Sequence, residues 1–164
     1  MLHVRFQTTY SLSRMNMSGS RSKLAIEVAA DRVAVYVAGR RLTETDDQPY
    51  MAAFAASLRA TRRRLEACLN YQANEGWFLG KGVDEAYRVL TSADSQLPGS
   101  VFDSQRFADW GPITDGHLTF LLPINGKLYL ATAAHGDGEI FAAEVNPWDL
   151  MSVLAAADDT LHAV

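Results

Sequence analysis

His135, Asp137 and Glu139 are the side chains whose types and spacing come closest to a reactive group in this sequence. An imidazole and carboxylates this close together are donors found in metal sites, and a histidine beside a carboxylate is a common general base. Gly136 and Gly138 separate the three residues, however, and glycine at alternate positions is typical of a turn. We therefore predict a turn here, with no metal, no cofactor and no enzymatic activity. The alternative is a small hydrolase in which His135 acts with Asp137.

The other nucleophiles lack the neighbours that catalysis requires. Ser100 lies near Asp103, but the sequence contains no Gly-x-Ser-x-Gly, no glycine-rich phosphate loop and no His-Glu-x-x-His pattern. Cys68, the single cysteine, follows Leu58 and Leu65 at helical spacing, which indicates a small buried apolar side chain. One cysteine also excludes an internal disulfide and a multi-cysteine zinc site.

A basic cluster and two aromatic residues are candidates for nucleic-acid binding. Arg59 and the three arginines at 62–64 are suited to phosphate contacts. Adjacent helical residues point about 100° apart, so these side chains do not form one patch, and we predict a solvated helix face. Trp77 and Phe78 stand among glycines and are able to stack on a base or a ligand. We expect them instead to seal one end of the core.

The acidic residues are concentrated in the second half of the chain. The net charge of −4 divides into 11 basic and 6 acidic residues over 1–74, and 4 basic and 13 acidic residues over 75–164. A negative face attracts a cationic partner and repels nucleic acid, while solubility alone is the alternative explanation. Where loops and turns meet at one edge of a sheet, carboxylates accept charge-assisted hydrogen bonds from a partner's lysines and arginines. The predicted partner-binding residues are Asp103, Asp109, Asp115, Asp137 and Glu139.

Apolar periodicity predicts the elements of the first half. Residues 23–29 and 33–37 alternate with a period of two and predict a β-hairpin whose second strand ends at 39–41. Pro49 is expected in the first turn of an amphipathic helix of about twenty residues, with Asp46 or Asp47 as N-cap and apolar side chains three and four positions apart. A glycine-rich loop is expected over 70–82, and a shorter helix follows it. The buried stripe predicted for the long helix includes Met51, Phe54, Leu58, Thr61 and Leu65.

An antiparallel meander is the clearest local prediction. The dipeptide 125–126 is Asn-Gly, the preferred pair of a type I′ turn, and it joins apolar runs over 117–122 and 127–132. A third strand over 139–145 completes the meander. The three strands therefore lie side by side in sequence order.

The segments on either side of the meander differ in how clearly they are marked. Residues 91–115 are predicted to be irregular, with room for a short helix over 102–110. The last helix has a well-marked start, with Asn146 as N-cap and Pro147 at its first position.

Together these elements predict an α+β fold. The N-terminal hairpin and the three-strand meander give a mostly antiparallel sheet, with helices packed on one face. We predict a single domain over 22–164 after a flexible leader over 1–21, in which Met15 and Met17 are alternative starts to Met1. No run of about 18 apolar residues is present, so we expect no membrane span. The N-terminus lacks the apolar core of a signal peptide, which favours the cytoplasm.

This order of elements resembles the small immunity proteins of bacterial polymorphic-toxin and contact-dependent growth inhibition systems. The resemblance begins with the paired strands Leu-Ala-Ile-Glu-Val at 24–28 and Val-Ala-Val-Tyr-Val-Ala-Gly-Arg at 33–40. It continues through the helix at 58–69 and the Asp-Glu-Ala-Tyr helix at 84–87 to the closing helix that begins Asn-Pro-Trp at 146–148. These motifs are short and mainly structural, and the Ser- and Arg-containing leader departs from the family's pattern.

The resemblance implies a cytoplasmic, non-catalytic inhibitor that binds one cognate toxin domain, often a nuclease. Family members vary at their interfaces, so the resemblance assigns no binding residue. An acidic face suits this role, because nuclease domains carry cationic substrate clefts. The alternative from another class is a secretion chaperone or adaptor that holds an exported effector. The sequence leaves the oligomeric state open.

Overall fold

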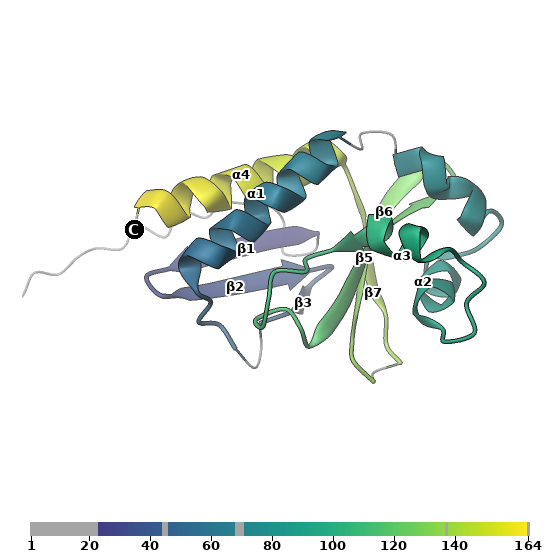
Figure 1. The fold of residues 1–164 in the computed structure, drawn as a ribbon, viewed down its shortest axis with the longest axis horizontal. Helices are drawn as coiled ribbons and strands as arrows, with labels where there is room; N and C mark the ends of the chain where they lie inside the picture. The colour runs from purple at the N-terminus through teal and green to yellow at the C-terminus, as the bar shows by residue number, and fades with distance from the viewer. Residues whose placement is uncertain (1–22, 44–45, 68–70, 137, 164) are drawn as a thin grey trace, which may run out of the picture.

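The computed structural model describes residues 23–43, 46–67, 71–136 and 138–163, so the leader predicted over 1–21 lies outside the described residues. Helices combined with two antiparallel sheets confirm the predicted α+β class (Figure 1). No helix in these ranges is long and apolar enough to cross a membrane. In chain order the elements are β1 (Leu24–Ala29), β2 (Arg32–Val37), β3 (Arg40–Arg41), α1 (Met51–Ala67), the 3₁₀ helix η1 (Tyr71–Phe78), α2 (Val83–Thr91), α3 (Gly99–Gln105), β4 (Arg106–Phe107), β5 (His117–Ile124), β6 (Lys127–Ala134), β7 (Phe141–Val145) and α4 (Pro147–Ala163).

The N-terminal sheet contains three antiparallel strands in the order β1-β2-β3. Pairing of β1 with β2 along its full length confirms the predicted hairpin. The prediction that residues 39–41 only end the second strand was wrong, because Arg40 pairs with Val37 and begins β3. Ala38 (φ 49°) and Gly39 (φ 83°) reverse the chain between these strands. Such turns are usually marked by Asn-Gly or Gly-Gly, and alanine at the first position conceals this one.

Replacing Ala38 with glycine is expected to raise the free energy of unfolding by about 0.5–1 kcal/mol, because glycine adopts a positive φ without the steric cost that alanine has. Urea unfolding measures the change. Ala34→Gly is the matched control: Ala34 lies in β2, where extended backbone carries no such strain, and glycine there lowers stability. Equal destabilisation by the two substitutions would show that the turn at Ala38 is unstrained.

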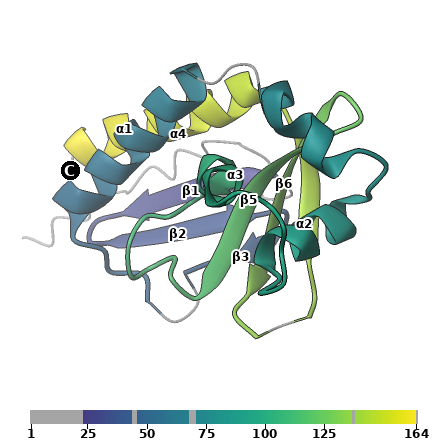
Figure 2. The ribbon, with the colours of Figure 1, turned by 45° about the vertical axis from the view of Figure 1, so that its right-hand side comes forward.

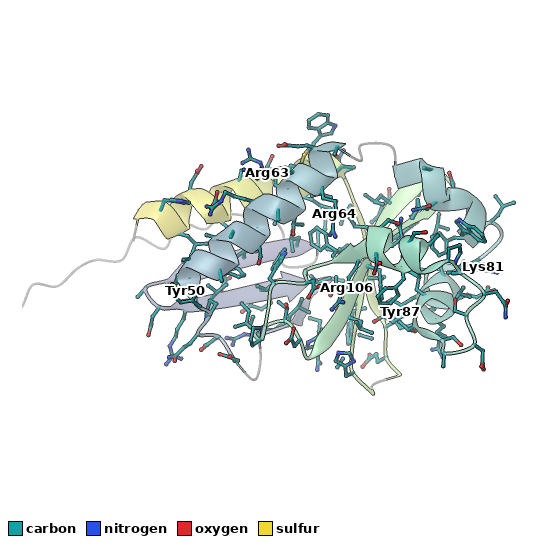
Figure 3. The ribbon with its side chains drawn as sticks, in the orientation of Figure 1. Tyr50, Arg63, Arg64, Lys81, Tyr87 and Arg106 are labelled. Atoms are coloured by element: carbon teal, nitrogen blue, oxygen red, sulfur yellow. The ribbon has the colours of Figure 1, made fainter. Side chains whose placement is uncertain are left out.

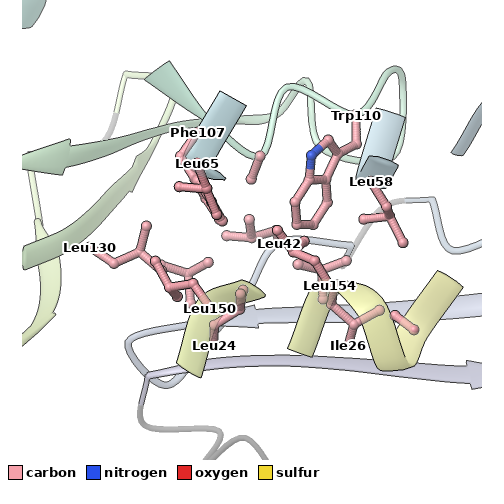
Figure 4. Packing of buried hydrophobic residues seen from close by; sticks show 14 of the residues in the cluster. Leu24, Ile26, Leu42, Leu58, Leu65, Phe107, Trp110, Leu130, Leu150 and Leu154 are labelled. Atoms are coloured by element: carbon pink, nitrogen blue, oxygen red, sulfur yellow. The ribbon is translucent and has the colours of Figure 1, made fainter. Parts of the chain in front are cut away.

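Helices α1 and α4 cover one face of the N-terminal sheet, side by side over β1 and β2 (Figure 1). The predicted stripe of α1 is confirmed, since Phe54, Leu58, Thr61 and Leu65 are buried, while Met51 is partly buried against the same core. Figure 4 shows the leucines of both helices packed together above the strands. The labelled residues of this core are Leu24, Ile26, Leu42, Leu58, Leu65, Phe107, Trp110, Leu130, Leu150 and Leu154.

The start of α4 is as predicted. The Asn146 side-chain oxygen accepts a hydrogen bond from the backbone N–H of Trp148 at 2.9 Å, and Pro147 is the first helical residue. This bond satisfies one of the N–H groups that a helix leaves unpaired at its beginning. The position of α4 over the first sheet therefore follows from a local signal and an apolar stripe.

The second sheet has four antiparallel strands in the order β4-β5-β6-β7 (Figure 2). Asn125 (φ 52°) and Gly126 (φ 74°) form the predicted turn and set Ile124 opposite Lys127. Strand β5 runs through Pro123, which was expected in the connection. In an antiparallel pair only alternate residues of β5 form hydrogen bonds with β6, and the nitrogen of Pro123 faces the β4 side instead. Strand β4 pairs only with residues 119–120 of β5, so a proline at 123 removes no hydrogen bond between strands.

Side chains on the two faces of β5 and β6 belong to two different cores. Leu121 and Leu130 face the core shared with α1, α4 and the first sheet. Phe120 and Ala131 face a second core, which α2, α3 and the end of η1 cover. The hairpin β5-β6 is therefore buried on both faces, with helical elements on the outer side of each core.

Two connecting segments differ from their predictions. The loop expected over 70–82 contains η1, and the short helix expected over 102–110 is α3, which ends at Gln105. The helix stops there because Phe107 pairs with Thr119 of β5 as part of β4. A partner more than ten positions away therefore decides where α3 ends.

Candidate partner-binding surface

The described members of the predicted acidic set are all exposed. Asp103 lies on α3, Asp109 follows β4, Asp115 precedes β5 and Glu139 precedes β7. Asp137 lies outside the described residues. The four carboxylates thus face solvent, as an interaction surface requires.

Asp115 and Glu139 lie in segments that meet at one end of the second sheet. The backbone N–H of His135 donates to the carbonyl oxygen of Gly116 at 3.0 Å, which joins the start of β5 to the turn after β6. Figures 1 and 2 show this start of β5 and the β6–β7 connection at the same end of the sheet. Helix α2 also reaches the β6–β7 connection, because the guanidinium of its Arg88 lies 3.5 Å from the Gly138 carbonyl oxygen.

Asp103 belongs to a different region. Helix α3 lies toward the middle of β5 in Figures 1 and 2, away from the β6–β7 connection. Asp103 is therefore set apart from Asp115 and Glu139. Asp109 lies in the loop between β4 and β5, where the backbone N–H of Trp110 donates to the Thr114 hydroxyl at 3.0 Å. The carboxylate of Asp109 forms an ion pair with Arg106 at 3.3 Å, which offsets its charge.

Internal ion pairs separate the exposed carboxylates of the second half into two groups. Glu85 pairs with Lys81 at 3.3 Å, and Glu144 pairs with Lys127 at 2.8 Å, where its carboxylate raises the pKa of that lysine. A second group makes no ion pair with another described residue, so no described basic side chain offsets its charge. These residues include Asp84, Asp94, Asp103 and Asp115.

The arginines of α1 do not gather into one patch. Arg59 pairs with Asp158 of α4 at 2.7 Å, and Arg62 pairs with Glu66 at 3.1 Å. Arg64 donates to the carbonyl oxygen of Arg106, while Arg63 is exposed, and Figure 3 shows Arg63 and Arg64 on different sides of α1. Most of this charge is therefore used in contacts within the protein.

Trp77 and Leu79 form an exposed apolar feature that sequence reasoning missed. The prediction that both aromatics seal the core holds for Phe78, which is 1% exposed, but Trp77 is 46% exposed and Leu79 is 75% exposed. The sequence did carry a signal for this exposure. Residues 77–79 are three consecutive large apolar residues before a glycine, and adjacent side chains cannot all point into the core. Gly80, at φ 75°, turns the chain directly after them.

Of the three side chains considered for a metal or catalytic site, the structure describes two. His135 and Glu139 are exposed, Asp137 is outside the described residues, and no three metal-ligating side chains come together within the described ranges. Comparison of the chain with protein-family models, with curated proteins and with solved structures gave no match. A functional assignment therefore depends on the surface features themselves.

Proposed function

We propose that this chain is a cytoplasmic immunity protein that binds a cognate toxin domain and neutralises it by direct contact, without catalysis. The observation that carries the proposal is the group of exposed carboxylates that have no ion pair with another described residue. Asp84, Asp103 and Asp115 represent this group on α2, on α3 and before β5.

A toxin domain that cleaves nucleic acid is the partner that best fits this charge. Such a domain binds phosphates through lysines and arginines, and exposed carboxylates imitate those phosphates. Opposite charges on the two proteins also accelerate their encounter at low ionic strength. The inhibitor thereby occupies the groups that the toxin needs for its substrate.

Reversing two of these charges tests the mechanism. In the double variant Asp103→Lys and Asp115→Lys, association with the toxin domain encoded beside this gene is expected to slow about tenfold at low salt, because steering depends on local charge. Stopped-flow kinetics at low and high salt measures the change, and salt is expected to reduce the difference.

The matched control places the same charge changes on the other half of the chain. Asp31 is exposed in the β1–β2 turn, and exposed Asp46 precedes α1, so Asp31→Lys with Asp46→Lys changes the net charge equally. Equal slowing in both variants would indicate an effect of net charge rather than of where the charges lie. An unchanged rate for Asp103→Lys with Asp115→Lys at low salt would remove the acidic mechanism, and absence of any complex with the unaltered chain would remove the immunity role.

A further inference from the structure

We infer that Trp77 and Leu79 form an apolar anchor that inserts into a pocket with a basic rim on the toxin domain; this rests on the proposed function. Large apolar side chains that face water on a protein surface are candidates for the centre of an interface, where burial supplies binding energy. Within the described ranges, the exposed large apolar side chains are Tyr50, Trp77, Leu79 and Trp148. Trp77 and Leu79 are the two that occur together, on either side of a single residue.

The segment that carries these side chains is held firmly in place. Phe78, between them, is packed in the second core. The Glu75 carboxylate accepts a hydrogen bond from the backbone N–H of Gly126 at 2.5 Å, which ties η1 to the β5–β6 turn. The Asn74 amide donates to the Ser104 hydroxyl at 2.9 Å and ties η1 to α3. An anchor held in this way loses little conformational freedom when it binds.

The charges near η1 identify the chemistry of the partner. Asp103 is next to Ser104, the residue that η1 contacts, and Asp84 is exposed in the first turn of α2. Two basic residues also lie close to η1 along the chain or through its contacts. Lys81, between η1 and α2, is offset by Glu85, and Lys127, next to Gly126, is offset by Glu144. Lysines and arginines around an apolar pocket would complement these carboxylates. Negative surfaces, including an anionic membrane or a second copy of the same region, would be repelled.

Binding measurements with anchor variants test the inference. Trp77→Ala and Leu79→Ser are each expected to raise the dissociation constant for the toxin domain encoded beside this gene at least about tenfold. Most of this increase should come from faster dissociation. This change is expected to persist at high salt, unlike the effect of charge reversal. Leu79 is mostly exposed, so Leu79→Ser should leave the folded state intact, and thermal unfolding of the free variants checks this.

Two other exposed aromatics serve as matched controls. Tyr50→Ala alters a side chain at the far end of the molecule from Lys81 in Figure 3, and Trp148→Ala alters a tryptophan on α4. Both variants are expected to bind within about twofold of the unaltered chain. In a Trp148→Phe background, Trp77 is the exposed tryptophan among the described residues, so complex formation should shift its fluorescence to the blue and protect it from acrylamide.

The outcomes separate the anchor from the wider role. If the unaltered chain binds and inhibits the toxin domain, but Trp77→Ala and Leu79→Ser bind as tightly, the anchor is wrong and the proposed function stands. Unchanged acrylamide quenching of Trp77 in the complex would also overturn the anchor. If the unaltered chain does not bind, the proposed function falls and the anchor falls with it. Self-association abolished by Leu79→Ser would identify a second copy as the occupant and overturn the assignment to a toxin domain.

Discussion

Trp110→Ala is expected to lower the free energy of unfolding by about 3–5 kcal/mol, because it leaves a large cavity in the main core. The Trp110 side chain is 2% exposed and packs edge-on against Phe54 and Phe107, with ring centroids 5.9 Å and 5.7 Å apart. Its indole N–H also donates to the Thr61 hydroxyl at 2.9 Å, across the interface between its loop and α1. Alanine removes the rings' contacts and leaves the Thr61 hydroxyl, in a buried residue, without this donor.

Two further variants separate the two contributions at Trp110. Trp110→Phe retains much of the apolar volume but loses the hydrogen bond, so we expect a smaller loss of about 1–3 kcal/mol. Trp148→Ala removes a tryptophan that is 63% exposed and is expected to change stability little. Urea unfolding followed by circular dichroism measures all three. Similar losses for Trp110→Ala and Trp148→Ala would contradict the packing described for Trp110.

Stability is expected to fall by up to about 2 kcal/mol as the pH rises from 10 to 12, through the titration of Tyr87. Burial raises the pKa of Tyr87 from 10.0 to about 12. The folded state therefore holds this proton more tightly than the unfolded state does, so the stabilisation is complete below pH 10 and is lost as the pH approaches 12. The hydroxyl donates to the carbonyl oxygen of Leu118 at 2.8 Å, a bond that the phenolate is unable to donate.

The variant Tyr87→Phe measures how much of the loss of stability between pH 10 and 12 is due to this residue. The variant loses the Leu118 hydrogen bond and is expected to be about 1 kcal/mol less stable at neutral pH, but its stability should fall less steeply above pH 10. Tyr50→Phe removes the hydroxyl of a tyrosine that is 80% exposed, and it should leave the steep decline in place. Urea unfolding at a series of pH values compares the slopes. A decline of the same steepness in Tyr87→Phe would assign it to other groups.

The parts of the fold predicted correctly are those marked by local chemistry. The Asn125-Gly126 turn and the Asn146 cap depend on residues within a few positions, and the stripe of α1 depends on spacing alone. Strand β3 was missed because alanine occupies the positive-φ position at 38, where sequence preference favours other residues. The end of α3 was misplaced because Phe107 pairs with Thr119, a contact that local spacing does not encode.

The candidate site shows the same division. Exposure of the acidic side chains followed from their type, since aspartate and glutamate are rarely fully buried. Their grouping depended on contacts such as that between His135 and Gly116, which only the folded chain supplies. Trp77 was assigned to the core because aromatic side chains are usually largely buried, although three consecutive large apolar residues at 77–79 cannot all face inward.

The two-sided burial of β5 and β6 has a consequence for how the molecule unfolds. We expect the two hydrophobic clusters to unfold together, because the same hairpin supplies a wall to each. The chain should therefore lose structure in one cooperative step, and backbone amides near Phe120 and Leu130 should exchange with deuterium only when the whole molecule opens. Binding of a partner at Trp77 and Leu79, beside the second core, should therefore also slow amide exchange in the core shared with α1 and α4.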